Sequence, residues 1–284
     1  MKKNYKLQYT VKKEIELLEF LYENVDKAKN VIKSLLKNKC ITVNNKVTTK
    51  HDYKLFPNDI IDIKLLNNED LDIIYEDNEI IVLNKRSGLL TIATNKEKEK
   101  TLYHMVSNYV KSINSNTKIY VVHRLDKDTS GIVMFAKNER IKKLLQNNWN
   151  DIVTHRKYVA LTEGNNINDS GTIKSYLKEN NSRMVYLTNK NEGKLAITHY
   201  KKIKQNKKYK LLDIEIETGG KNQIRVQLNQ IGLNIVGDKK YGYHTDPIKR
   251  LCLHSYLLEF IHPINKKKMH FETNIPNSFM NLVK

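Results

Sequence analysis

Residues 120–138 read YVVHRLDKDTSGIVMFAKN and place a cluster of charged side chains between two apolar runs. The β-branched and aromatic residues at 120–122 and 132–135 are typical of strands, and Thr129-Ser130-Gly131 is typical of a turn. The stretch therefore predicts a strand, a loop and a second strand. Buried strands fix the backbone while such a loop presents its side chains to a ligand, so the loop is a candidate functional site.

The charged cluster consists of His123, Arg124, Asp126 and Asp128. If the first strand continued into the cluster, Arg124 and Asp126 would project from the same face of it. A carboxylate beside a cation stays ionised, and such a carboxylate can take part in catalysis. The plainer alternative is a tight turn in which both acids are solvated.

A calcium site is a third reading of the same loop. Residues 126–131 match the opening D-x-[DN]-x-[DNS]-G of an EF-hand. The twelfth position of an EF-hand should be a bidentate Glu but is Lys137, and the flanks predict strands where helices are required. The sequence therefore disfavours calcium. The nine histidines show no metal-ligand spacing either, so no metal is expected.

A family resemblance rests on this loop. The run His123-Arg124-Leu125-Asp126 followed by Thr129-Ser130-Gly131 resembles the H-R-L-D-x-x-T-S-G signature of the RluA family of RNA pseudouridine synthases. Similar segments follow in the expected order, namely IIYEDNEIIVLNKRSGLL at 73–90, KYVA at 157–160 and TGGKNQIRVQL at 218–228. The resemblance implies an isomerase that converts uridines of RNA to pseudouridine without any cofactor. It implies 23S ribosomal RNA as the substrate, with transfer RNA as the alternative.

The resemblance also implies roles for individual side chains. Asp126 is the expected catalytic carboxylate, and Arg225 is the ion-pair partner that keeps it ionised. Tyr158 is expected to stack on the turned base and to assist proton removal. Arg124 is expected to fill the space that the target base leaves when it flips out of its stack, and His123 to contact RNA.

The segment at 218–228 departs from the family pattern. Family members commonly carry Arg, Thr and His where this chain has Gly220, Lys221 and Asn222, and His where it has Gln227. Lys221 is expected to replace the cation that is missing at Gly220 and so to bind RNA. A helix is expected to open at Asn222, and helix N-termini attract anions. The effect of the departures on RNA contacts stays open.

The composition of the chain indicates a globular protein with a polyanionic partner. Of the 284 residues, 39% are hydrophobic, and 50 Lys and Arg face 31 Asp and Glu, which gives a net charge of +19. This excess of cations is typical of nucleic-acid binding. No long apolar segment and no signal-type segment at the start of the sequence is visible, so we expect a cytoplasmic monomer without a membrane partner.

Residues 1–66 predict a small α/β RNA-binding domain. Apolar spacing and turn residues predict two amphipathic helices, a hairpin and a strand, at 11–25, 28–36, 41–47 and 60–65. This order resembles the alpha-L RNA-binding module of a small-subunit ribosomal protein. Lys33 and Lys37 of the second helix are therefore expected to bind RNA, although a face that merely aids solubility is the alternative.

The polar residues 67–72 predict a linker, and residues 73–284 the catalytic domain. Helices are predicted at 102–113 and 141–145. Strands are predicted at 157–161, 172–177, 183–187, 196–203 and 209–216. The fold class is therefore α+β, with a mainly antiparallel mixed sheet and flanking helices.

Two other classes of function stay open at this point. A non-catalytic RNA-binding protein, such as a ribosome-assembly factor, would need only the charge and the amino-terminal module. The intact Asp126 argues against it. A metal-dependent nuclease could use Asp126 and Asp128, but no further acids or histidines cluster at the spacing that a nuclease needs.

Overall fold

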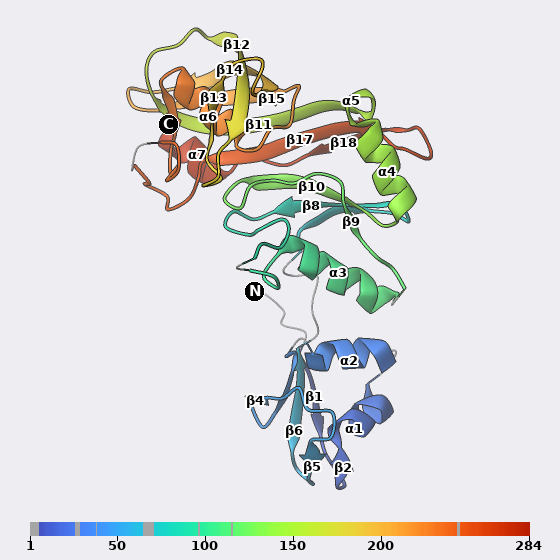
Figure 1. Ribbon diagram of the computed structural model, residues 1–284. Helices are drawn as coiled ribbons and strands as arrows, with labels where there is room; N and C mark the ends of the chain where they lie inside the picture. The colour runs from blue at the N-terminus through green and yellow to red at the C-terminus, as the bar shows by residue number, and fades with distance from the viewer. Residues whose placement is uncertain are drawn as a thin grey trace. The chain divides into compact units, whose positions relative to one another are not determined.

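The computed structural model describes residues 6–25, 29–37, 39–64, 71–95, 97–114, 116–242 and 245–284 (Figure 1). Contacts within the chain divide it into two units. The first unit comprises Met1–Asp72 and Tyr103–Ile119, and the second comprises Ile73–Leu102 and Tyr120–Lys284. Residues 67–70 of the expected linker lie outside the described ranges, so the domain boundary stays a prediction.

The first unit combines short strands with helices. They are β1 (Lys6–Thr10), β2 (Ile15–Glu16), α1 (Leu17–Asn24), α2 (Lys29–Lys37), β3 (Ile41–Val43), β4 (Lys46–Val47), β5 (Lys54–Leu55), β6 (Ile60–Lys64) and α3 (Leu102–Ile113). Strands β1, β6, β3 and β4 form an antiparallel sheet in this order. Leu21 of α1 and Leu36 of α2 are buried with Ile41 and Ile63 of the sheet. Burying a side chain of this size contributes about 1.5–3 kcal/mol, so one apolar core holds α1, α2 and the sheet together.

The helix predicted at 11–25 begins only at Leu17, so the prediction is wrong for its first six residues. Ile15–Glu16 instead pairs with β5, and the backbone N–H of Val11 donates to the carbonyl of Asp59. Val11 and Ile15 are nevertheless buried. Their spacing therefore reflects extended segments that face the same core as the helix. The predicted hairpin is confirmed, since Asn44 and Asn45 adopt positive φ between β3 and β4.

The second unit is built on one sheet, which has 12 strands in the described part of the chain. They are β7 (Ile73–Glu76), β8 (Ile80–Lys85), β9 (Tyr120–Val121), β10 (Ser130–Ala136), β11 (Val153–Gly164), β12 (Ser170–Glu179), β13 (Val185–Thr188), β14 (Lys194–Gln205), β15 (Lys210–Ile216), β16 (Leu233–Ile235), β17 (Leu253–Ile261) and β18 (Lys268–Glu272). The main path runs β13-β12-β14-β15-β11-β17-β10-β8-β7. Strands β10 and β17 are parallel, whereas β11 pairs antiparallel with β15 and β17. This arrangement confirms the α+β class.

Helices flank this sheet in Figure 1: α4 (Glu139–Asn147), α5 (Trp149–Ile152), α6 (Gln223–Gln230) and α7 (Asn277–Leu282). Helix α4 begins with Asn138, whose side chain accepts a hydrogen bond from the backbone N–H of Ile141. Helices α3 and α4 confirm the predictions at 102–113 and 141–145. None of the described helices is long and apolar enough to cross a membrane.

Strand β10 positions the signature loop. All seven of its residues are buried, and it lies between β8 and β17. At its start Gly131 has φ +115°, and a Cβ there would collide with the backbone carbonyl of Ser255 on β17. Only glycine fits both the conformation and this close approach. The loop that precedes β10 is therefore anchored at a fixed point of the sheet.

Candidate active site

Asp126 lies in the loop between β9 and β10, with 28% of its side chain exposed. Strand β9 ends at Val121, so Arg124 and Asp126 lie in the predicted loop, and the case in which a strand carries both on one face does not occur. The reason is a hydrogen-bonding partner outside the sheet. Thr91 Oγ1 donates to the carbonyl of Leu125 (2.7 Å) and accepts from its N–H (3.2 Å). Arg124 is exposed and makes no hydrogen bond or ion pair with any described residue.

Lys85, the last residue of β8, holds the same loop by hydrogen bonds to backbone carbonyls. Its side chain is 1% exposed, and Nζ donates to the carbonyls of Arg86 (3.1 Å), Leu89 (2.7 Å) and Lys127 (3.0 Å). Burial lowers the pKa of Lys85 to about 7. Lys85 was not predicted as a functional residue, although a cation at the end of the apolar run 80–85 is a signal that could have indicated it.

Arg225 of α6 is 8% exposed and is oriented by Asp238. Nε and Nη2 donate to the two carboxylate oxygens of Asp238 at 2.8 and 2.7 Å, while Nη1 lies 3.5 Å from Oδ2 of Asp126. Burial raises the pKa of Asp238, but the hydrogen bond and charge of Arg225 outweigh burial and lower it overall. The expected contact of Arg225 with Asp126 is thus longer than its contacts with Asp238. The bidentate pair with Asp238 fixes the position of the guanidinium.

Asn222 immediately precedes α6 and faces Asp126. Its backbone is left-handed (φ 52°), a conformation that Asn tolerates. The N and O atoms of an amide are assigned from their partners. With nitrogen towards Asp126, Nδ2 donates to Oδ2 (2.6 Å) and Oδ1 (3.2 Å), and the amide oxygen accepts from Lys240 Nζ (3.2 Å) and the Tyr241 hydroxyl (2.9 Å). The Tyr241 hydroxyl accepts a hydrogen bond from the N–H of Val185, so its own proton is available to be donated to the Asn222 oxygen.

Tyr158 lies on β11 and packs, partly buried, against the core of this unit. Burial raises its pKa, Arg156 and Ser255 lower it, and the charge of Asp126 raises it further. The hydroxyl is therefore protonated at neutral pH, and it lies within electrostatic reach of Asp126. The structure thus places Arg225 3.5 Å from Asp126, and Tyr158 lies where the charge of Asp126 affects it.

Two of the expected RNA-binding residues of this unit, His123 and Lys221, already have partners within the protein. Met134 N–H donates to Nε2 of His123 (3.1 Å), and burial lowers the pKa of His123 to about 3. The imidazole is thus neutral and links the loop to β10. Lys221 forms an ion pair with Glu179. In the first unit, Lys33 and Lys37 are exposed on α2.

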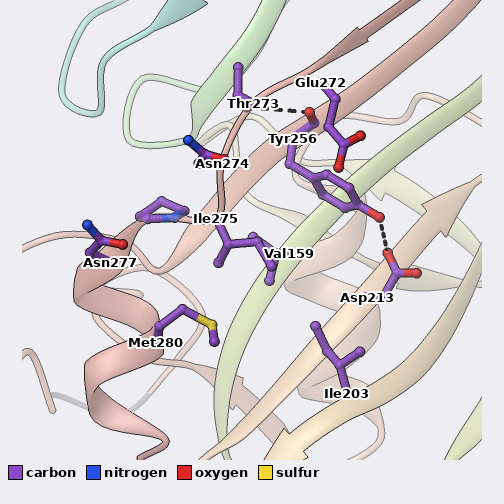
Figure 2. A pocket seen from close by; sticks show the side chains of 11 residues that line it. Val159, Ile203, Asp213, Tyr256, Glu272, Thr273, Asn274, Ile275, Asn277 and Met280 are labelled. Carbon is purple, nitrogen blue, oxygen red and sulfur yellow. Dashed lines mark hydrogen bonds between the residues drawn. The ribbon is translucent and has the colours of Figure 1, made fainter.

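The groove in Figure 2 lies on the other face of β11, because Val159 lines it and side chains alternate along a strand. Two acids, Asp213 and Glu272, line it as well, and the Tyr256 hydroxyl donates to Asp213 (2.8 Å). Carboxylates repel phosphates. The groove is therefore unsuited to an RNA backbone and separate from the group around Asp126.

Comparison with known proteins identifies the family. Residues 79–230 match the family model described as RNA pseudouridylate synthase. The chain is 30% identical over 271 residues to the uncharacterized RNA pseudouridine synthase YlyB of Bacillus subtilis, covering 91% of this chain and 89% of that protein. It is 35% identical over 207 residues to ribosomal large subunit pseudouridine synthase D of Borreliella burgdorferi, covering 70% and 64%.

A solved structure shares the fold. Human RNA pseudouridylate synthase domain containing 1 superposes with a TM-score of 0.60 at 20% identity, covering 74% of this chain and 85% of that one. The family match at 79–230 spans Asp126, Tyr158 and Arg225. The resemblance of the signature loop is thereby confirmed: the chain belongs to the RNA pseudouridylate synthase family, of the RluA-like type, and is an isomerase that acts on RNA.

Proposed function

We propose that this enzyme isomerises specific uridines of large-subunit ribosomal RNA, with Asp126 as the catalytic carboxylate. The observation that carries the proposal is the convergence of Arg225, Asn222 and Tyr158 on Asp126 at the edge of a buried sheet. The name of the Borreliella burgdorferi relative supports the choice of RNA. Transfer RNA is the alternative substrate.

The reaction needs a group that acts beside the sugar. The bond from ribose C1′ to N1 of the base breaks, the base turns, and C1′ bonds to C5. The proton lost at C5 is balanced by one gained at N1. Asp126 serves as nucleophile or proton acceptor at the sugar. Asn222 and Arg225 lie nearest to its Oδ2, at 2.6 and 3.5 Å, which leaves Oδ1 with the weaker contact and more available for the reaction.

Tyr158 and Arg225 complete the chemistry in this proposal. Because its hydroxyl is protonated at neutral pH, Tyr158 acts as an uncharged group whose ring stacks on the turned base. Its oxygen takes the proton from C5 only as its own hydroxyl proton passes to a second acceptor, for which the carboxylate of Asp126 is near. Arg225 stays charged beside Asp126 and places a positive charge 3.5 Å from its Oδ2. The guanidinium needs no substrate contact for this, since Asp238 already holds it.

A pseudouridine map tests the proposal. RNA from cells with and without this protein is treated with a carbodiimide that marks pseudouridine, and the marked sites are compared. We expect one or a few sites in 23S ribosomal RNA to disappear without the protein. Loss of sites in transfer RNA alone would move the substrate to that class, and unchanged maps would refute the proposed function.

We expect Arg124→Ala to lower isomerisation by about tenfold or more while RNA affinity keeps its salt dependence. In the proposal Arg124 fills the space of the flipped base, and unstacking a base costs a few kcal/mol. Its exposed side chain has no competing partner among the described residues. Single-turnover rates and binding at several salt concentrations separate the two effects. A flatter salt dependence would make Arg124 a phosphate contact instead.

We expect the double change Lys33→Gln and Lys37→Gln to flatten the salt dependence of RNA binding. Both lysines are exposed on α2. Each lost phosphate contact reduces the log–log slope by about 0.7 on single strands, so two contacts give about 1.4. Salt titrations of the full-length protein measure this. An unchanged slope would leave these lysines as a face that aids solubility, and the RNA-binding role of the amino-terminal unit would be unsupported.

A further inference from the structure

Arg156 is a half-buried cation without an acidic partner among the described residues. It lies on β11, where Nη2 donates to the backbone carbonyl of Glu217. The guanidinium carbon lies 5.9 Å from the ring centroid of Trp149, the first residue of α5. Burying a charge is costly unless an opposite charge compensates for it, and neither a carbonyl nor an aromatic ring carries a full charge.

The position of Arg156 points to the group around Asp126. Arg156 precedes Tyr158 by two residues on β11, so both project from the same face of the sheet. The charge of Arg156 lowers the pKa values of both His123 and Tyr158, and the charge of Asp126 raises that of Tyr158. Tyr158 therefore lies within electrostatic reach of both Arg156 and Asp126. Any anion at Arg156 would lie at the border of the proposed active site.

The loop after β15 passes close to the guanidinium of Arg156. A Cβ at Gly219 would lie 2.9 Å from Nη1 of Arg156, closer than real Cβ contacts come. The absence of a side chain at Gly219 thus leaves room for Nη1 of Arg156 beside this loop. The family commonly has an arginine where this chain has Gly220, and Arg156 supplies a cation next to the same loop from another strand.

We propose that Arg156, backed by Trp149, binds a phosphate of the RNA strand next to the target uridine. A phosphate would provide the missing negative charge, and the guanidinium retains N–H donors that form no hydrogen bond with the described residues. Phosphate contacts position a strand without reading its sequence. Arg156 would therefore set how the strand lies over Asp126. The inference rests on the proposed function, because it requires RNA as the ligand.

The test combines protein variants with neutral RNA linkages. The probe is an RNA oligonucleotide from the segment that the full-length protein protects from nuclease, with single phosphates replaced in turn by uncharged methylphosphonates. We expect wild-type protein to lose about tenfold in affinity at one linkage, as for a hydrogen bond to a charged group. The Arg156→Gln variant should bind unmodified RNA about tenfold more weakly than the wild type does. Neutralising the sensitive linkage should not weaken its binding further, and the log–log salt slope of its binding should fall by about 0.7.

Arg140→Gln is the matched control, because it removes the same charge from an exposed arginine of α4. It should keep the wild-type response at every linkage. Arg156→Lys should restore part of the affinity, since it keeps the charge without the planar fork. If Arg156→Gln loses as much affinity as the wild type at each neutralised linkage, the proposed phosphate site is refuted. If that variant keeps the wild-type pattern of affinity losses but unfolds at a lower temperature, Arg156 has a structural role only.

These affinity measurements, which combine protein variants with neutral linkages, do not depend on turnover. Isomerisation of the unmodified probe by the wild-type protein is measured separately. If the wild type isomerises the probe and Arg156→Gln shows no coupling to any linkage, the phosphate site fails while the proposed function stands. If coupling is found but the map of cellular RNA is unchanged, the phosphate site stands and the proposed function fails.

Discussion

Asp126→Asn is expected to abolish pseudouridine formation while RNA affinity changes by no more than a few-fold. The substitution keeps the size of the side chain and removes the charge that the reaction needs at the sugar. Groups that take part in proton transfer commonly contribute about 10²–10⁴-fold to the rate, so the loss should reach at least the upper end of this range. Binding depends mainly on phosphate contacts, which one loop carboxylate does not make.

Single-turnover assays and binding isotherms on the same RNA measure both quantities. Asp128→Asn is the matched control: it makes the same change two residues along the same loop, at an exposed side chain. The control should keep most of the activity. Turnover above background in Asp126→Asn, or an equal loss in Asp128→Asn, would remove Asp126 from its proposed role.

The sequence predicted the elements that depend on local pattern. The apolar spacing at 102–113 coincides with α3, and Asn44-Asn45 supplies the turn residues of the β3–β4 hairpin. The same kind of pattern failed at 11–16. Apolar spacing reports which residues face a core, and two extended segments around Val11 and Ile15 satisfy it as well as a helix does.

The contacts of the site could not be predicted, because they join residues that lie far apart in the chain. Lys85 donates to the carbonyl of Lys127, and Thr91 donates to the carbonyl of Leu125. Both contacts depend on the pairing of β8 with β10. Asp238 is close in sequence to Arg225, yet nothing local indicates that the tight pair forms there. The resemblance supplied Asp126, Tyr158 and Arg225, whereas the structure alone shows what holds them in place.

Asn222→Asp should impair the enzyme more than removal of the side chain does. With its nitrogen towards Asp126, the Asn222 amide donates to both oxygens of that carboxylate, at 2.6 and 3.2 Å. An Asp in its place can still accept from Lys240 and Tyr241, but it presents an oxygen to Asp126 where a donor was. Two carboxyl groups at this distance share one proton over a range of pH in which an isolated carboxyl is ionised. Asp126 is then protonated for part of the time and inactive.

Asn222→Gly is the matched control, because glycine also adopts the left-handed backbone of residue 222 (φ 52°) and removes only the donor. Loss of one hydrogen bond to a charged group costs about 1.5–3 kcal/mol, so the Gly variant should be slower by about tenfold or more. The Asp variant should be slower still at low pH and should approach the Gly variant as pH rises, because the shared proton is then lost. Rate against pH for the three proteins measures this. Parallel profiles for the two variants would mean that residue 222 does not contact Asp126 in the active enzyme.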